Sequence, residues 1–189
     1  TGVDSTSGTT FSSATDTVAA PVTAVNDAPV ASGSSTLASV AEDASDPAGA
    51  TVTSLFTSNF SDATDAVTGG SSANTLAGVA IVGNAATVAQ GAWQYFNGTS
   101  WVAVGSPDSS TALFAAQDGK LRFVPAANYN GTPGSLTAHL VDNSSGTITS
   151  GNTVNLSGGG ATGGTTVYSV ATVPLGTSVT AVNDAPVAV

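Results

Sequence analysis

Cysteine is absent from this 189-residue sequence, and histidine occurs once. Without cysteine the chain forms no disulfide, no thiolate metal site and no thiol nucleophile. The single histidine, His139, alternates with Ala138 and Leu140, which predicts a position on the face of a strand with no identifiable nucleophile beside it. We therefore expect that the protein is not an enzyme.

Basic residues are almost as scarce. Lys120 and Arg122 stand against 12 acidic residues, and the net charge is −10. A surface of this sign repels phosphate backbones and anionic lipid headgroups and attracts cations. No apolar run approaches the length of a membrane span. We therefore expect no nucleic-acid partner and no membrane insertion.

A sustained apolar period of 3.6 residues is also lacking, so helix should be negligible. Short apolar runs are instead separated by clusters of Gly, Asn, Asp and Ser, which predicts an all-β fold built as a β-sandwich. The expected strands cover residues 36–41, 51–57, 77–83, 91–96, 100–105, 111–116, 120–124, 135–142, 147–156, 165–174 and 177–182.

Two hairpins are expected from local turn residues. Asn97-Gly98 tolerates the positive φ that a tight turn requires, so residues 91–96 should pair with 100–105. Residues 117–119, Gln-Asp-Gly, should join the next two strands in the same way. On the second of these strands, Lys120 and Arg122 alternate with apolar residues and should face solvent.

The first hairpin carries four aromatic residues, which are Trp93, Tyr95, Phe96 and Trp101. Exposed rings in such a cluster could stack on sugars, which makes a glycan-binding module an alternative function. Aromatic residues in a chain with few large side chains are more often core, and this is the favoured interpretation. Trp93 and Tyr95 should share one face, while Phe96 should point the other way.

The ten residues from Val22 to Ala31, VTAVNDAPVA, return letter for letter as Val179 to Ala188. The two copies begin 157 residues apart (179 − 22), and this spacing is about the length of a whole domain. It suggests that the sequence is a segment of a tandem array of domains. We expect residues 1–25 to be the C-terminal strand or strands of a preceding repeat, 26–28 a linker, 29–182 one complete repeat and 183–189 the linker to the next. Residues 1–25 could alternatively donate a strand to a neighbouring copy, which would make the chain a filament subunit.

Within the repeated segment, Asn26-Asp27 precedes Pro29, where strand pairing must stop. Acidic residues also follow several predicted strands, where loops of a sandwich gather: Glu42, Asp62, Asp65 and Asp142. Carboxylate and amide oxygens are the ligands that calcium prefers. Asn-Asp pairs and acids at strand ends also form ordinary Asx-type turns. Taken by itself, Asn26-Asp27 fits such a turn better than it fits a calcium site.

Several motifs in order resemble the cadherin-like repeats of giant type I-secreted bacterial adhesins, the RTX and biofilm-associated class. They are the decapeptide, Ala41-Glu-Asp, Phe60-Ser-Asp-Ala-Thr-Asp, Ala92-Trp-Gln-Tyr, Leu121-Arg-Phe-Val-Pro-Ala-Ala-Asn-Tyr-Asn-Gly and Leu140-Val-Asp. Together they cover nearly the whole chain. The resemblance implies a Greek-key sandwich of the cadherin or immunoglobulin type, in an extracellular, cell-surface protein of a Gram-negative bacterium. The resemblance also implies that adjacent repeats of such a protein are binding partners of one another, and that the array of repeats supports cell adhesion and biofilm formation.

The resemblance also implies Ca²⁺ at the joints between repeats. Asn26 and Asp27 fit the linker ligands, Asp62 and Asp65 the acidic loop, and Asp142 the strand-end acid, all at one end of the domain. Glu42 would lie at the opposite end near Asn183 and Asp184. The chain departs from the cadherin pattern at Ala24, in the two-residue spacing of the loop acids and in lacking an Asp-Arg-Glu motif. Fewer carboxylates imply fewer or weaker calcium ions.

Overall fold

The computed structural model describes residues 16–186 and is mostly β, with one short α-helix and four separate sheets. A four-stranded sheet has the order β4-β10-β7-β8, and a six-stranded sheet has the order β12-β9-β6-β11-β13-β2. Two small sheets pair β1 with β5 and β14 with β3. The strands are β1 (Val30–Ala31), β2 (Ser35–Thr36), β3 (Val40–Ala41), β4 (Ala50–Thr51), β5 (Phe60–Ser61), β6 (Leu76–Asn84), β7 (Gly91–Phe96), β8 (Trp101–Ala103), β9 (Ala112–Ala116), β10 (Lys120–Pro125), β11 (Leu136–Asp142), β12 (Thr153–Val154), β13 (Tyr168–Gly176) and β14 (Val179–Thr180).

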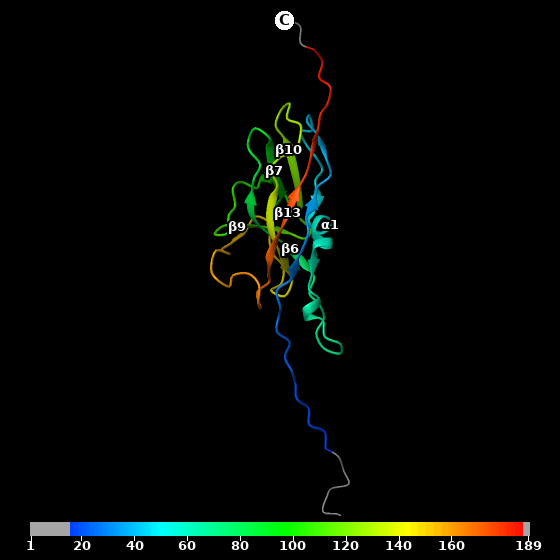
Figure 1. The fold of residues 1–189 in the computed structure, drawn as a ribbon, viewed down its shortest axis with the longest axis vertical. Helices are drawn as coiled ribbons and strands as arrows, with labels where there is room; N and C mark the ends of the chain where they lie inside the picture. Colours follow the sequence, from blue (N-terminus) through cyan, green and yellow to red (C-terminus); the bar gives the residue numbers. More distant parts are fainter. Residues whose placement is uncertain (1–15, 187–189) are drawn as a thin grey trace, which may run out of the picture.

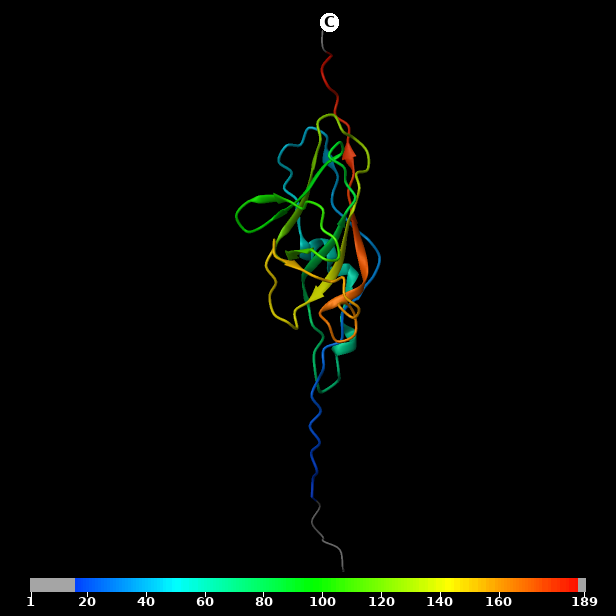
Figure 2. The same cartoon turned by 90° about the vertical axis from the view of Figure 1, so that its left-hand side faces the viewer.

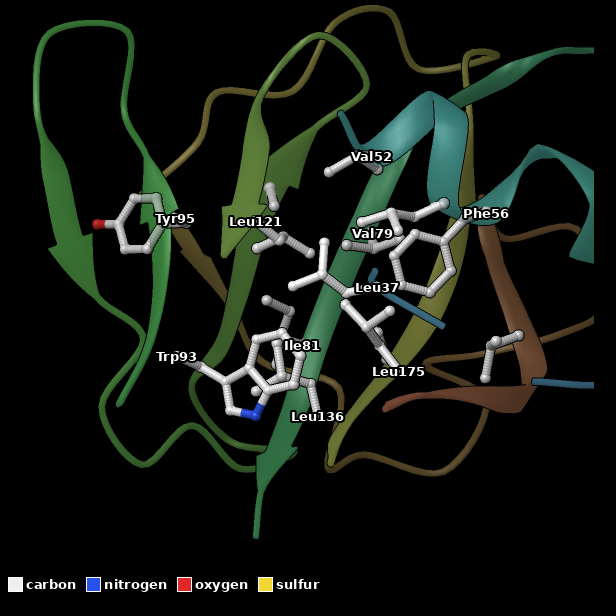
Figure 3. Close-up of a cluster of buried hydrophobic side chains, with 14 of the residues drawn as sticks. Leu37, Val52, Phe56, Val79, Ile81, Trp93, Tyr95, Leu121, Leu136 and Leu175 are labelled. Carbon is white, nitrogen blue, oxygen red and sulfur yellow. The ribbon is translucent and has the colours of Figure 1, made fainter. Parts of the chain in front are cut away.

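The main core contains side chains from both large sheets and from the helix. Trp93 and Phe123 of the four-stranded sheet meet edge to face, with ring centroids 5.3 Å apart, and both are fully buried. Figure 3 shows Val79, Ile81 and Leu136 of the six-stranded sheet pointing into the same cluster. Burying these large apolar side chains is the main favourable term for the fold.

A second, smaller core covers the opposite face of the six-stranded sheet. It contains Ala80, Val141 and Leu156, with Phe114 stacked on Tyr168 at a centroid distance of 6.3 Å. The loop region between β11 and β13 supplies much of this cover. β6 is therefore buried on both faces over most of its length, as its continuous apolar sequence favours.

The strand predicted over residues 51–57 is wrong after its first residue. β4 ends at Thr51, and the helix α1 (Val52–Phe56) follows, continued by the 3-10 turn η1 (Thr57–Asn59). The Thr51 side chain caps the helix by accepting the Ser54 backbone N–H at 3.2 Å. Val52, Leu55 and Phe56 are spaced to bury one helical face, a pattern too short to stand out among strands.

The hairpin predicted at Asn97-Gly98 is confirmed, because β7 and β8 pair antiparallel with Phe96 opposite Trp101. The hairpin predicted at residues 117–119 is wrong. β9 pairs with β6 and β12, whereas β10 pairs with β4 and β7. The turn therefore carries the chain from one sheet to the other, a choice that turn residues alone do not encode.

Most other predicted strands occur, with shifted ends. The stretch 36–41 divides into β2 and β3, and 147–156 contains only β12. The expectation for residues 1–15 lies outside the described residues. Residues 16–25 form no helix or strand and are exposed.

The described chain leaves the body at opposite ends of its long axis. In Figure 1 the blue segment before β1 runs downward and the red segment after β14 runs upward, and the view in Figure 2 agrees. Within residues 16–186, no helix has the length and apolarity needed to cross a membrane. The two copies of the decapeptide therefore lie at the two poles of the molecule.

Candidate functional site

Side chains from four segments meet where the first decapeptide enters the body. We call Asn26, Asp62, Asp65, Asn74 and Asp142 the acidic pole. β1 pairs with β5, Val30 opposite Ser61, which brings residues 26–28 beside the 3-10 turn η2 (Ala63–Asp65). β6 and β11 run antiparallel with Leu76 opposite Asp142. Asn74, just before β6, and Asp142, at the end of β11, therefore lie at the same end of the six-stranded sheet.

Two asparagine amides link the carboxylates of the acidic pole. Asn26 Nδ2 donates to Asp142 Oδ2 at 3.4 Å, and Asn26 Oδ1 accepts from Asn74 Nδ2 at 2.9 Å. Asn74 Nδ2 also donates to Asp65 Oδ2 at 2.8 Å, and the Asn74 backbone N–H donates to Asp62 Oδ2 at 2.7 Å. The result is one continuous network from β11 to η2.

The three carboxylates of the acidic pole are buried, with Asp62 4%, Asp65 7% and Asp142 1% exposed. Asp142 Oδ1 accepts from the Ser144 backbone and hydroxyl, whereas Asp62 Oδ1 is buried and has no hydrogen-bond partner. Desolvation, and then repulsion from Asp65 and Asp142, raise the pKa of Asp62 above its usual range. This excess of buried negative charge favours binding of either a proton or a cation.

Basic side chains do not supply that cation. The only ion pair among residues 16–186 joins Arg122 to Asp46. Arg122 also lies over the Trp101 ring, 4.1 Å from its centroid, and is 7% exposed. The prediction that Arg122 faces solvent is therefore wrong, because Trp101 from the neighbouring hairpin covers it; Lys120 is exposed.

The donor set of the acidic pole fits a hard cation only in part. Carboxylate oxygens, Asn26 Oδ1 and nearby backbone carbonyls are oxygens of the kind calcium takes. A pocket of about 260 Å³ borders them, lined by Asn26, Asp65, Asn74 and neighbouring serines. However, no three acidic, histidine or cysteine side chains in the described chain lie close enough together to hold one metal ion. An ion using all three carboxylates would require the two amides to move from between them.

Asp27 joins the hydrogen-bond network of the acidic pole through its backbone and not through its carboxylate. Its N–H donates to Asp65 Oδ1 at 2.9 Å, while its side chain is exposed. The next residues are also fixed: the Ala28 N–H donates to Gly164 O at 2.7 Å, and Pro29 is buried. A ligand role for the Asp27 side chain stays a prediction.

The other pole is organised by Glu42, which directly follows β3. β3 pairs parallel with β14, Val40 opposite Val179. Glu42 is 6% exposed, and its Oε1 accepts the Val182 N–H at 2.7 Å while its Oε2 accepts from Asn130 Nδ2 at 3.0 Å. These two hydrogen bonds, the Val182 one first, lower the pKa of Glu42. We call Glu42, Asn130 and Val182 the Glu42 pole.

Asn183 and Asp184 follow immediately and are exposed. Asn183 Nδ2 donates only to the Asp184 backbone oxygen, at 3.4 Å, among the described partners. The structure thus places these residues at the Glu42 end of the molecule, but their side chains do not join Glu42 in a cluster. Their role as ligands stays a prediction.

Sequence reasoning missed Asn74, Ser144 and the Thr166 backbone oxygen, which accepts from Asn26 Nδ2 at 3.2 Å. Asn74 directly precedes the apolar strand β6, but its place beside Asp142 follows from the register of β6 on β11, which the sequence does not show. Thr166 offered no signal, since any residue supplies a carbonyl.

The aromatic hairpin divides as expected into two faces. Trp93 and Tyr95 are core, and Trp93 Nε1 donates to Gly134 O at 2.8 Å. Phe96 and Trp101 are half-buried and meet edge to face at 5.4 Å. These two rings line a pocket of about 190 Å³ together with Lys120 and Arg122. Sugar binding stays a prediction for that pair alone.

Comparison with protein-family models, with curated proteins and with solved structures gives no match.

Proposed function

We propose that this chain is a structural extender repeat of a large extracellular bacterial adhesin or surface filament, stiffened by calcium where consecutive repeats join. Its two large sheets would form a cadherin-like, Greek-key sandwich, and its role would be mechanical: to hold other, ligand-binding parts away from the cell. Adjacent repeats of the same protein are the partners of each unit.

The observation that carries this proposal is the acidic pole. Three buried carboxylates belong to one hydrogen-bond network through Asn26 and Asn74, although in the described chain they do not lie close enough together to hold one ion as they stand. Asp62 Oδ1 has no partner, and neither basic side chain of the sequence pairs with these carboxylates. Buried charge of one sign is costly unless a counter-charge compensates it. A divalent cation would remove this repulsion, and it would do so where the repeated Asn-Asp segment enters the body.

The position of the two poles also supports the proposal. The decapeptide copies leave the body at opposite ends of the long axis (Figure 1), so repeats joined through them would follow one another in line. An in-line arrangement is what a spacer requires.

Thermal unfolding with and without calcium tests the metal. In EDTA the acidic pole carries its full repulsion, and added Ca²⁺ at about a hundred times the dissociation constant should contribute about 2.7 kcal/mol of stability. For a chain of this size that corresponds to a rise of roughly 5–10 °C in Tm. Mg²⁺, which demands tighter octahedral geometry, should act less.

Asp62→Asn is the diagnostic variant, because it keeps an oxygen for the Asn74 N–H but removes the unpartnered charge. We expect it to melt above the wild type in EDTA and to lose most of the calcium response. Asp118→Asn, in the exposed turn before β10, is the matched control and should respond as the wild type does. A wild type indifferent to calcium, or an Asp62→Asn chain with the full response, would contradict the site.

A further inference from the structure

The two identical decapeptides are bound to the body of the protein through different halves of the ten residues. In the C-terminal copy the first half is bound: Val179 is 5% exposed, pairs with β3 and exchanges backbone hydrogen bonds of 2.7 and 2.9 Å with Gly131. The Val182 N–H binds Glu42, and from Asn183 onward the described residues are exposed.

In the N-terminal copy the second half is bound. Val22 and Val25 are 92% and 67% exposed, and the hydrogen bonds to the body begin at Asn26, which binds Asp142, Asn74 and Thr166. The contacts continue through Asp27, Ala28 and Pro29. Over its described residues, each copy thus leaves unbound the half through which the other copy is bound to the body.

Resting on the tandem-repeat part of the proposed function and not on its calcium, we propose that one decapeptide docks with both halves at once between consecutive repeats, and that no linker residue is left free. Val182 is the last residue held by the preceding unit. The next residue, Asn183, is identical in sequence context to Asn26 and would be the first residue held by the following unit. The partner surface of the acidic pole is thus the Glu42 pole of the repeat before it.

The joint would then be restrained by the protein itself. The freedom of a linker grows with the number of its unbound residues, and here that number falls to none. One residue spans at most about 3.6 Å, so the two poles must abut. The exposed, extended course of residues 16–25 away from the body leaves room for a preceding unit (Figure 1). Calcium would add stability to a joint already held by hydrogen bonds and a strand pair.

A seamless two-repeat chain tests this inference. Residues 1–182 followed directly by residues 26–189 contain two whole units and one decapeptide at the joint, with its natural sequence. Because the chain has no cysteine, Val88→Cys in each unit, at a position 94% exposed, provides two unique spin labels. The distance between them is measured by double electron–electron resonance, first in EDTA and then in calcium.

The matched control inserts Gly-Ser-Gly-Ser between Val182 and the following Asn26, which adds roughly 10 Å of end-to-end freedom. We expect the seamless chain to give one narrow distance distribution in EDTA and the insertion chain a clearly broader one. A narrow distribution that calcium leaves unchanged supports the inference and removes calcium as the source of stiffness. A distribution that is broad in EDTA and narrow only in calcium overturns the inference and leaves the calcium role. Broad distributions in both conditions overturn both.

Discussion

Val179 and Val22 begin identical ten-residue segments, yet Val179 is 5% exposed and Val22 is 92% exposed. Later in the same segments the order reverses: Asn26 is half-buried and Pro29 buried, whereas Asn183 and Pro186 are exposed. Local sequence therefore does not decide which half of the segment is structured. The surface that each pole of the body presents decides it.

The two poles hold their halves by different chemistry. The Glu42 pole uses a strand pair, an apolar contact to the core and one carboxylate with both oxygens satisfied. The acidic pole uses side-chain amides between three buried carboxylates, one of them incompletely satisfied. A satisfied carboxylate stabilises without further help, whereas a half-satisfied network is costly until something completes it. Identical substitutions in the two copies separate these contributions.

The largest difference is expected between Val179→Ala and Val22→Ala. Val179 packs in the main core, so loss of its two methyl groups should lower the free energy of unfolding by roughly 2 kcal/mol. Val22→Ala removes the same atoms from an exposed position and should change it by less than about 0.5 kcal/mol. Urea unfolding of both variants measures the difference. Equal losses would mean that Val22 is also buried in solution.

Asn26→Ala and Asn183→Ala should differ in the same way but by less, and at the other pole. Asn26 joins Asp142, Asn74 and Thr166, so its removal leaves polar groups without partners and should cost about 1–2 kcal/mol. Asn183→Ala should be neutral in this chain, within about 0.5 kcal/mol. Denaturant unfolding in EDTA is the measurement, because calcium would mask the loss. If Asn183→Ala proved the more costly of the two, the assignment of docked halves would be reversed.

The sequence predicted the parts of this comparison that follow from alternation and from the motif resemblance. Trp93 and Tyr95 lie on the core face because they alternate along one strand. The gathering of Asn26, Asp62, Asp65 and Asp142 at one pole follows from the motif resemblance and not from alternation. No sequence signal showed that Asp27 contributes its N–H and leaves its carboxylate exposed, since backbone donors are common to all residues except proline.

The errors have a shared physical origin in tertiary choice. The turn at residues 117–119 satisfies hairpin chemistry, but the edges of β9 are taken by β6 and β12, so β10 joins another sheet. Thr51 and the spacing of Val52, Leu55 and Phe56 support a helix only because a core lies on that side. Asn74 enters the site through the register of β6 on β11. Pairing partners, unlike alternation, are not encoded locally.

The smallest expected effect is an opposite pH dependence at the two poles. The pKa of Asp62 is raised by desolvation and by its acidic neighbours. Its folded pKa thus exceeds its unfolded pKa, and the stability it contributes is present below the unfolded pKa and lost as pH rises through the folded one. The pKa of Glu42 is lowered by hydrogen bonds from Val182 and Asn130. Its contribution is present above the unfolded pKa and lost as pH falls through the folded one.

Asp62→Asn and Glu42→Gln should therefore diverge from the wild type in opposite directions as pH rises from about 3 to 7, the range in which carboxyl groups titrate. In EDTA, Asp62→Asn should gain stability relative to the wild type with rising pH, because it never acquires the repelled charge. Glu42→Gln should lose stability over the same range, because it never acquires the charge that two donors stabilise. Urea unfolding across this range, with Asp118→Asn as a control on a solvated turn, measures both slopes. If stability changed with pH in the same direction for both variants relative to the wild type, the carboxyl groups of Asp62 and Glu42 would lie in equivalent environments. The two poles would then differ only in which half of the decapeptide each one binds.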